Sequence, residues 1–387
     1  MEKKIYLDNS ATTPLSEAAR QAVLEAMECY GNPSSLHTLG QQSERLLRTA
    51  RESILSALGV RPRQGTVVFT SCGTEATSLA IFGCAYAKTR RDATRILTTD
   101  SEHPATMEAL DVLAKDGFEI VRIPTVDGVL DMNAIDAALD KKIFMATFML
   151  VNNETGALYS LKEAFGKIKR RYPDAITHCD AIQGFMRVRF SPQSLGAQLV
   201  SLSGHKIHAP KGVGALYIDS ELIKTRRIVA FLRGGGQESG MRSGTENVIG
   251  IAAFGASTAD MQARRTHIEE HLEGLYLYAT DKLSALGVKI NRPACHVDHI
   301  INITLPDIKS ETMLHHLSAG GIYVSSGSAC SSHSSKPSGA LIAFGLTPHM
   351  ADCSLRISLS EYNTEADIDA LCESVKTGLE KLVRIKK

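Results

Sequence analysis

The sequence contains no run that approaches the ~18 consecutive apolar residues of a membrane-spanning helix. Residues 1–8 also lack the apolar core of a secretory signal. The formal net charge is only +1, which gives no reason to expect nucleic acid or an acidic membrane as the main partner. We therefore expect a cytoplasmic protein that acts on neither membranes nor nucleic acids.

No Cys-x-x-Cys pair occurs among the eight cysteines, which are scattered along the 387 residues. Disulfide frameworks are typical of short secreted chains, so we expect reduced thiols. Residues 295–299, with the sequence Cys-His-Val-Asp-His, resemble half of a metal site. The sequence offers no second half, and structural zinc needs a full set of ligands. We therefore predict no metal.

Two glycine-rich segments lack the spacing of nucleotide-binding loops. Gly234-Gly235-Gly236 is not followed by the Gly-Lys-Ser/Thr of a P-loop. Gly212-Val213-Gly214 lacks the third glycine of a dinucleotide-binding fingerprint. Neither segment predicts a nucleotide site.

Short apolar runs alternate with longer amphipathic ones from about residue 60 to about residue 260. Helices are predicted to begin near Thr74 and to run through Leu110 and Leu113. The predicted strands are residues 67–70, 95–99, 143–151, 175–179 and 199–203. This alternation predicts an α/β fold with a mostly parallel central sheet, in which ligands bind beyond the carboxyl ends of the strands.

The last third of the chain has a different pattern. Residues 364–367, Thr-Glu-Ala-Asp, resemble a capping box and predict the start of a helix. Apolar residues follow at helical spacing: Ile368, Leu371, Val375, Leu379 and Leu382. Residues 325–339 are about half serine and include Cys330, a composition typical of a surface loop. The sequence has no internal repeat and no clear linker.

Polar residues follow several of the predicted strands. Lys206 lies just after residues 199–203, Asp180 ends another strand, and Gln183 follows it. Pyridoxal phosphate needs a lysine for its covalent attachment and an acid that keeps its pyridine nitrogen protonated. A solvated loop lysine is the simpler explanation of Lys206 alone. Together the three residues favour a pyridoxal-phosphate site.

Two further segments suit such a site, although each has an ordinary structural explanation. In residues 71–75, Gly73 would let the backbone approach a phosphate at a helix N-terminus, where Thr74 adds a hydroxyl. Ordinary helix capping by Thr74 explains the segment equally well. His103 precedes Pro104, which is typical of a helix start. Its imidazole could instead lie on the cofactor ring and move protons.

The chain resembles the NifS/IscS-type cysteine desulfurases, which belong to the class V aminotransferase family of fold-type I pyridoxal-phosphate enzymes. The segments that carry the resemblance follow the family's order: residues 6–13 (YLDNSATT), 31–35 (GNPSS), 102–103 (EH), 151–156 (VNNETG), 180–183 (DAIQ), 203–206 (SGHK), 233–238 (RGGGQE), 242–247 (RSGTEN) and 326–330 (SGSAC). The resemblance implies a large cofactor-binding domain of residues 16–260. It also implies a smaller α+β domain of residues 1–15 and 261–387, and a homodimer.

The resemblance also implies the role of each site residue. Lys206, Cys330 and His103 would be catalytic, and Asn153 and Arg356 would hold the substrate carboxylate. Lys206 would bind the cofactor and move protons. The cofactor would be pyridoxal 5'-phosphate, held by Gly73, Thr74, His103, Asn153, Asp180, Gln183, Ser203, His205, Lys206 and, from the partner subunit, Thr245.

In the family the loop cysteine takes sulfur from cofactor-bound L-cysteine, which leaves a persulfide and releases L-alanine. Cys330 would take this role and pass sulfur to an acceptor protein such as an iron–sulfur scaffold or the thiolation machinery. His333 and Lys336 depart from the family's loop, which leaves the acceptor open. A selenocysteine or cysteine lyase and a small-amino-acid aminotransferase are alternatives on the same scaffold. A non-catalytic assembly scaffold is a further one, but Lys206, Asp180 and Cys330 argue against it.

Overall fold

The computed structural model describes residues 4–87, 93–326 and 337–384. A seven-stranded sheet lies at the centre, in the order β2-β8-β7-β6-β5-β3-β4. In the described part of the chain only β8 runs against its neighbours in this sheet, so the prediction of a mostly parallel sheet is confirmed. The strands are β2 (Gly65–Thr70), β3 (Arg95–Thr99), β4 (Glu119–Ile123), β5 (Ile143–Met149), β6 (Ile176–Asp180), β7 (Leu199–Ser203) and β8 (Gly214–Asp219).

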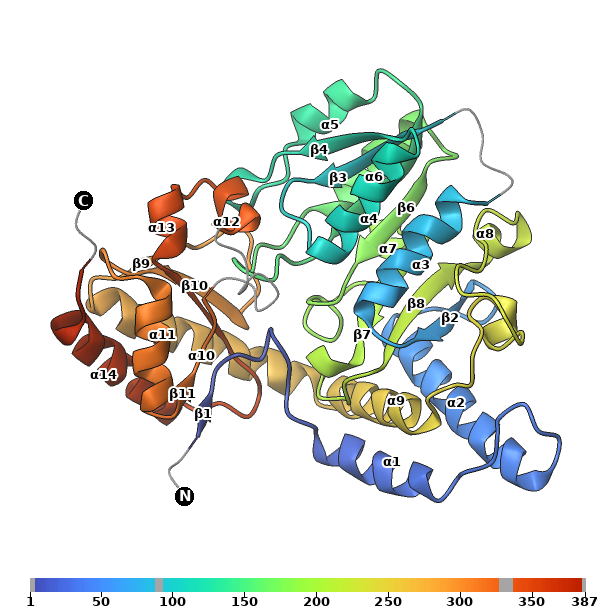
Figure 1. Cartoon of the computed structure of the whole chain (residues 1–387), viewed down its shortest axis with the longest axis horizontal. Coiled ribbons are helices and arrows are strands. Elements are labelled where there is room, and N and C mark those ends of the chain that lie inside the picture. The colour runs from blue at the N-terminus through green and yellow to red at the C-terminus, as the bar shows by residue number, and fades with distance from the viewer. Residues whose placement is uncertain (1–3, 88–92, 327–336, 385–387) are drawn as a thin grey trace.

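Helices pack on both faces of this sheet, as strands with two apolar faces require. Along β2, Val67 and Phe69 join one hydrophobic cluster and Val68 joins another, because successive side chains point to opposite faces. Figure 1 shows the sheet between these layers. The helices of this part are α1 (Glu17–Met27), α2 (Thr38–Ala57), α3 (Gly73–Ala85), α4 (Pro104–Lys115), α5 (Met132–Ala138), α6 (Leu161–Arg171), α7 (Pro192–Leu195), α8 (Ser220–Lys224) and α9 (Val248–Ala263).

A second group of elements lies to one side of the large sheet, on the left in Figure 1. It contains the antiparallel sheet β12-β10-β9 and the short parallel pair β1-β11. Helix α14 begins with the predicted capping box of Thr364 and Asp367. The elements are β1 (Ile5–Tyr6), α10 (Arg265–Ala285), β9 (Lys289–Ile290), β10 (Ile300–Thr304), α11 (Ser310–Ala319), β11 (Ile322–Tyr323), α12 (Gly339–Ala343), α13 (Pro348–Asp352), β12 (Ser354–Ser358) and α14 (Glu365–Lys381).

The N-terminal segment, residues 4–13, contacts both groups of elements. Ile5 pairs with Ile322 in the small sheet. At the other end of the segment, the backbone amide of Thr13 donates to the carbonyl oxygen of His205, just beyond β7. The segment therefore runs past the carboxyl ends of the parallel strands, where ligands bind in sheets of this kind.

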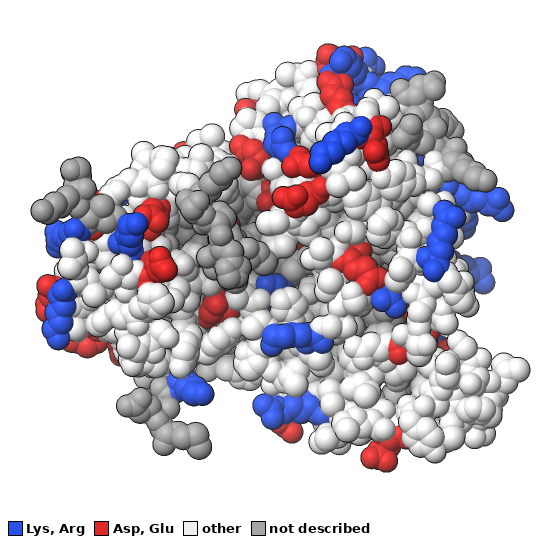
Figure 2. All heavy atoms as spheres, in the orientation of Figure 1, with Lys and Arg blue, Asp and Glu red and all other residues white. Residues whose placement is uncertain are grey.

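The surface gives few hints about partners. Acidic and basic side chains are interspersed on the face that Figure 2 shows. Within the described ranges, we find no helix with the length and apolar character needed to cross a membrane. The cysteines of these ranges are free thiols: Cys29, Cys72, Cys84, Cys179, Cys295, Cys353 and Cys372.

Candidate active site

A cavity of about 180 Å³ opens beyond the carboxyl ends of β5, β6 and β7. It brings together residues from both groups of elements and from the N-terminal segment. Most of the predicted site residues line it: Gly73, Thr74, His103, Asn153, Asp180, Gln183, Ser203, His205, Lys206 and Arg356. These residues are spread over most of the chain, so only the fold brings them to one place.

Lys206 and Asp180 face this cavity from the ends of neighbouring strands. The Lys206 ammonium donates to the carbonyl oxygens of Ser10 and Ala11, at 2.9 Å for the second. The Asp180 carboxylate accepts a hydrogen bond from the backbone amide of Ile182 at 3.0 Å. Burial raises the pKa of Asp180 to about 6, although the positive charge of Lys206 opposes this shift. A cationic ring nitrogen is the partner that such a buried carboxyl would favour.

The proposed phosphate site lies at the N-terminus of α3. No side chain caps this helix at Cys72, so its first amides remain available to an anion. Thr74 lies inside the helix and is not its cap. A Cβ added to Gly73 would come within 2.5 Å of Ile182 and 3.2 Å of Ser203, so only glycine leaves this space open. The Ser203 hydroxyl is buried and has no hydrogen-bond partner, as expected of a group that awaits a ligand.

His103 lies at a helix start and also lines the cavity. It is the N-cap of α4, where its Nδ1 accepts a hydrogen bond from the Ala105 amide at 3.1 Å. Its ring also lines the cavity. Burial, helped by the charge of Lys206, lowers the pKa of His103 to about 4. The imidazole is therefore neutral near pH 7, and its Nε2 carries the proton.

Arg356 is 1% exposed, so it is not a residue of a surface ion pair. It lies on β12, and its guanidinium donates to the Asn153 carbonyl oxygen at 2.9 Å and to the Asp8 carboxylate at 2.8 Å. Its Nε is buried without a partner. A fixed, planar cation at the edge of the cavity suits a substrate carboxylate. Asp8 belongs to a matched motif, but its contact with Arg356 could not be predicted from the sequence.

One predicted residue lies elsewhere, and another is outside the described part of the chain. Thr245 lines a separate, smaller cavity together with Ser71 and Glu238, and does not line the cavity of Lys206. Cys330 lies outside the residues that the structure describes. Within those residues, no group of three or more His, Cys, Asp or Glu side chains is arranged to hold a metal, and this includes residues 295–299.

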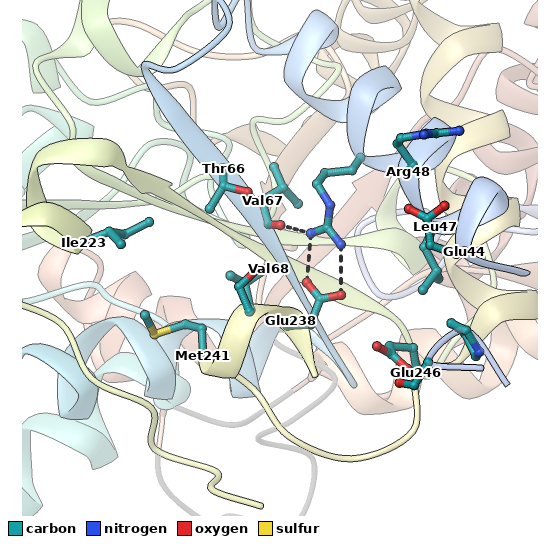
Figure 3. A pocket seen from close by; sticks show the side chains of 14 residues that line it. Glu44, Leu47, Arg48, Thr66, Val67, Val68, Ile223, Glu238, Met241 and Glu246 are labelled. Atoms are coloured by element: carbon teal, nitrogen blue, oxygen red, sulfur yellow. Dashed lines mark hydrogen bonds and ion pairs between the residues drawn. The ribbon is translucent and has the colours of Figure 1, made fainter. Parts of the chain in front are cut away.

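A larger cavity, of about 270 Å³, lies apart from this site between α2, β2 and the loop around Glu238. Figure 3 shows Glu238 at its centre. The Glu238 carboxylate receives two hydrogen bonds from Arg51, at 2.8 and 3.0 Å, and a third from the Phe69 amide. Because these donors already satisfy the carboxylate, Glu238 holds the loop that carries Thr245 in place.

Several residues that line the main cavity were not predicted from the sequence. Cys72 and Ile182 adjoin predicted residues in the sequence, and Met149 and Val151 lie shortly before Asn153. The carbonyl oxygens of Ser10 and Ala11 contribute backbone atoms, which no side-chain motif can reveal. Ser10 and Ala11 lie within residues 6–13, one of the segments that carry the family resemblance, and only this pointed to a place in the site.

This site fits pyridoxal phosphate: a lysine, a buried carboxyl, an imidazole and an uncapped helix N-terminus with an unpartnered hydroxyl surround one cavity. The fold and the site thus define a pyridoxal-phosphate enzyme. The family model for class V aminotransferases matches residues 5–371, and the chain belongs to this family.

The chain is similar over nearly its whole length to cysteine desulfurases. It is 37% identical to the cysteine desulfurase of a Nostoc species, over 98% of this chain and 93% of that one. It is 36% identical to the cysteine desulfurase NifS of Azotobacter vinelandii, over 96% and 91% of the two chains. A solved NifS-like protein superposes with a TM-score of 0.90 at 30% identity, over 98% of this chain and all of that one. A structure described as SspA in complex with cysteine superposes with a TM-score of 0.79 at 27% identity, over 94% of this chain and all of that one.

Proposed function

We propose that this protein is a cysteine desulfurase, which converts L-cysteine to L-alanine and collects the sulfur as a persulfide on Cys330. The observation that carries the proposal is the cavity in which Lys206, Asp180 and Arg356 meet. The whole-chain similarity to cysteine desulfurases supports it. The relatives' names favour this reaction over a lyase or an aminotransferase.

The bound cofactor supplies an electron sink for the bond electrons of the substrate's α-carbon. Arg356 and Asn153 orient the L-cysteine carboxylate, because a rigid guanidinium fork pairs well with a carboxylate. Lys206 holds the cofactor and moves a proton at the substrate carbon. Neutral His103 would pack on the cofactor ring, and its Nε2–H would be a second group that exchanges a proton in the cavity.

The sulfur step conserves atoms and electrons. The Cys330 thiolate attacks the sulfur of L-cysteine, so an S–S bond forms as the Cβ–S bond breaks. The β-carbon of the substrate takes up a proton, and the products are L-alanine and a Cys330 persulfide. No external oxidant or reductant is needed. Sulfur then passes to an acceptor protein such as an iron–sulfur scaffold or a thiolation enzyme.

A single-turnover experiment on Cys330→Ser tests this proposal. The loaded wild type, mixed with one equivalent of L-cysteine, should form L-alanine and gain one sulfur atom in its intact mass. Cys330→Ser should still change the cofactor's absorption spectrum, because the substitution leaves the cavity residues in place. It should form neither persulfide nor more than traces of alanine, since an alcohol does not ionise near neutral pH. Release of alanine and sulfide at the native rate would refute the mechanism. Cys295→Ser, which removes an exposed thiol outside the proposed site, is the matched control and should form the persulfide normally.

We also propose that the protein is a homodimer in which Thr245 reaches the partner's cofactor site. Thr245 lies outside the cavity of its own chain, which supports this arrangement. Large apolar side chains are exposed on either side of Pro33 and Ser34, which line the Glu238 cavity, and a few residues before Glu238 in the chain: Tyr30, Leu36, Phe231 and Leu232. A second copy of the chain would bury them. The free thiols favour a reducing compartment such as the cytoplasm.

A further inference from the structure

Glu102 is a buried acid that the proposed reaction does not use. It follows β3 and is 7% exposed. One carboxyl oxygen, Oε1, accepts hydrogen bonds from the Thr99 hydroxyl and from the Met149 amide, both at 2.8 Å. The other oxygen, Oε2, is buried without a hydrogen-bond partner. A buried carboxylate normally gathers donors on both oxygens, so this half-satisfied group is unusual.

The surroundings of Glu102 disfavour a negative charge. Met149, whose amide donates to Glu102, pairs with Asp180 in the β5–β6 register, which places the two acids close together. The charge of Glu102 would also raise the pKa values of two other titratable groups nearby, Tyr159 and the Cys179 thiol. In the described part of the chain, no basic side chain forms an ion pair with Glu102. The Lys206 charge acts instead on Asp180.

We propose that Glu102 is a positioning residue that keeps a proton near pH 7, so that Asp180 alone carries the negative charge at the cofactor's ring nitrogen. Ionising two buried acids this close together has a high free-energy cost, so the two acids share one proton. Glu102 holds that proton because its Oε2 has no donor. Asp180 loses it because the Ile182 amide and the Lys206 charge stabilise its anion.

The pKa directions agree with this assignment. Burial, reinforced by the charge of Asp180, raises the pKa of Glu102 to about 8, although its two hydrogen bonds oppose the shift. The pKa of Asp180 rises only to about 6. Near pH 7 the pair therefore carries one negative charge, and that charge lies on Asp180. The inference rests on the proposed role of Asp180 toward the cofactor.

Infrared spectroscopy of the cofactor-loaded enzyme tests the protonation state without turnover. At pH 7 the wild type should show the carbonyl stretching band of a buried protonated carboxylic acid, and this band should disappear as the pH rises through about 8. The band should be missing in Glu102→Gln and should persist in Asp180→Asn. Absence of the band in the wild type, or its loss in Asp180→Asn alone, would overturn the proposal. Because no turnover is measured, a failed desulfurase assay leaves this result interpretable.

Stability and cofactor retention give a second, independent readout. The folded pKa of Glu102 lies above its unfolded value, so its contribution to stability is complete at low pH and is lost as pH rises toward about 8. Glu102→Gln imitates the protonated acid. Its thermal midpoint should therefore fall less steeply between pH 5 and pH 8, and its cofactor dissociation constant should change by less than about tenfold. The buried, ion-paired Glu238 is the control, since Glu238→Gln should lower the midpoint throughout this range. An unchanged pH slope in Glu102→Gln would contradict the proposal.

Discussion

Arg356 donates a 2.8 Å hydrogen bond to Asp8, although 348 positions separate the two residues in the sequence. Ser325 joins them, since its hydroxyl donates to the same Asp8 oxygen at 2.8 Å. Asp8, which lies just after β1, therefore holds the cation that is proposed to bind the substrate carboxylate. The site is complete only when both ends of the chain are folded against the large sheet.

Arg356→Lys should raise the KM for L-cysteine by about tenfold to a hundredfold, because a hydrogen bond to a charged group contributes ~1.5–3 kcal/mol. A single ammonium cannot reproduce the fork that reaches both Asn153 and Asp8. The fall in kcat should be smaller. Steady-state kinetics checks this, with Arg189→Lys, in a surface ion pair with Glu269, as the control. An unchanged KM would remove Arg356 from the substrate site.

Lys206→Ala should abolish covalent attachment of the cofactor and lower turnover by at least ~10³-fold, since the residue is proposed both to bind the cofactor and to move a proton. The protein should still fold, because Lys206 lines the cavity and is not part of the hydrophobic core. Borohydride reduction and peptide mapping of the wild type should find the cofactor on Lys206. Lys211→Ala is the neighbouring control. A label on Lys211 would contradict the assignment.

The sequence predicted most of the inner strands of the sheet because short, largely apolar or β-branched runs mark them. Strand β5, for example, is buried at every residue from Ile143 to Met149. Strand β4 was missed because it is an edge strand with exposed Glu119 and Arg122, so it lacks such a run. Strand β8 was also missed, and the structure gives it a reversed direction that a pattern of alternating strands and helices does not reveal.

The site was predicted residue by residue from motifs, and the cavity brings most of those residues together. What the sequence could not give is the contacts between motifs. The Asp8–Arg356 ion pair and the Glu102–Met149 hydrogen bond each join segments that lie far apart in the chain. In the sequence, Glu102 was notable only as the neighbour of His103 in a matched motif. The division into residues 16–260 and the remainder stays a prediction, as does the role of each site residue.

Thr245→Ala should weaken cofactor binding by about tenfold to a hundredfold, the effect of losing one hydrogen bond of ~1.5–3 kcal/mol to a charged phosphate. Covalent attachment to Lys206 should remain possible. Equilibrium dialysis of the cofactor checks this, and Thr377→Ala, on the distant helix α14, should have no effect. If Thr245 acts across a dimer, sedimentation should find the loaded enzyme as a dimer. An active, cofactor-loaded monomer would contradict that arrangement.

The acid limit of stability should depend on Glu361, which follows β12 in the smaller group of elements and pairs with Arg187 and His208 of the larger one. Its carboxylate contacts Arg187 at 3.1 Å and the His208 ring at 3.2 Å, and both Glu361 and Arg187 are almost fully buried. Burial alone would raise the pKa of Glu361. The charge of Arg187 and the hydrogen bond with His208 outweigh burial and hold this pKa well below its usual range.

Because the folded pKa of Glu361 is depressed, its contribution to stability is present above the unfolded pKa and is lost as the pH falls below it. Glu361→Gln leaves Arg187 as an unpaired buried charge, which should cost ~3–5 kcal/mol of the free energy of unfolding at pH 7. The deficit relative to wild type should shrink as the pH is lowered from about 4.5, the ordinary value for a glutamate. Urea unfolding across this range measures it. Asp369→Asn, which removes an exposed partner of Lys282, is the control and should cost only ~0–1 kcal/mol. A deficit that stays constant down to pH 3 would show that Glu361 acts through packing and not through its charge.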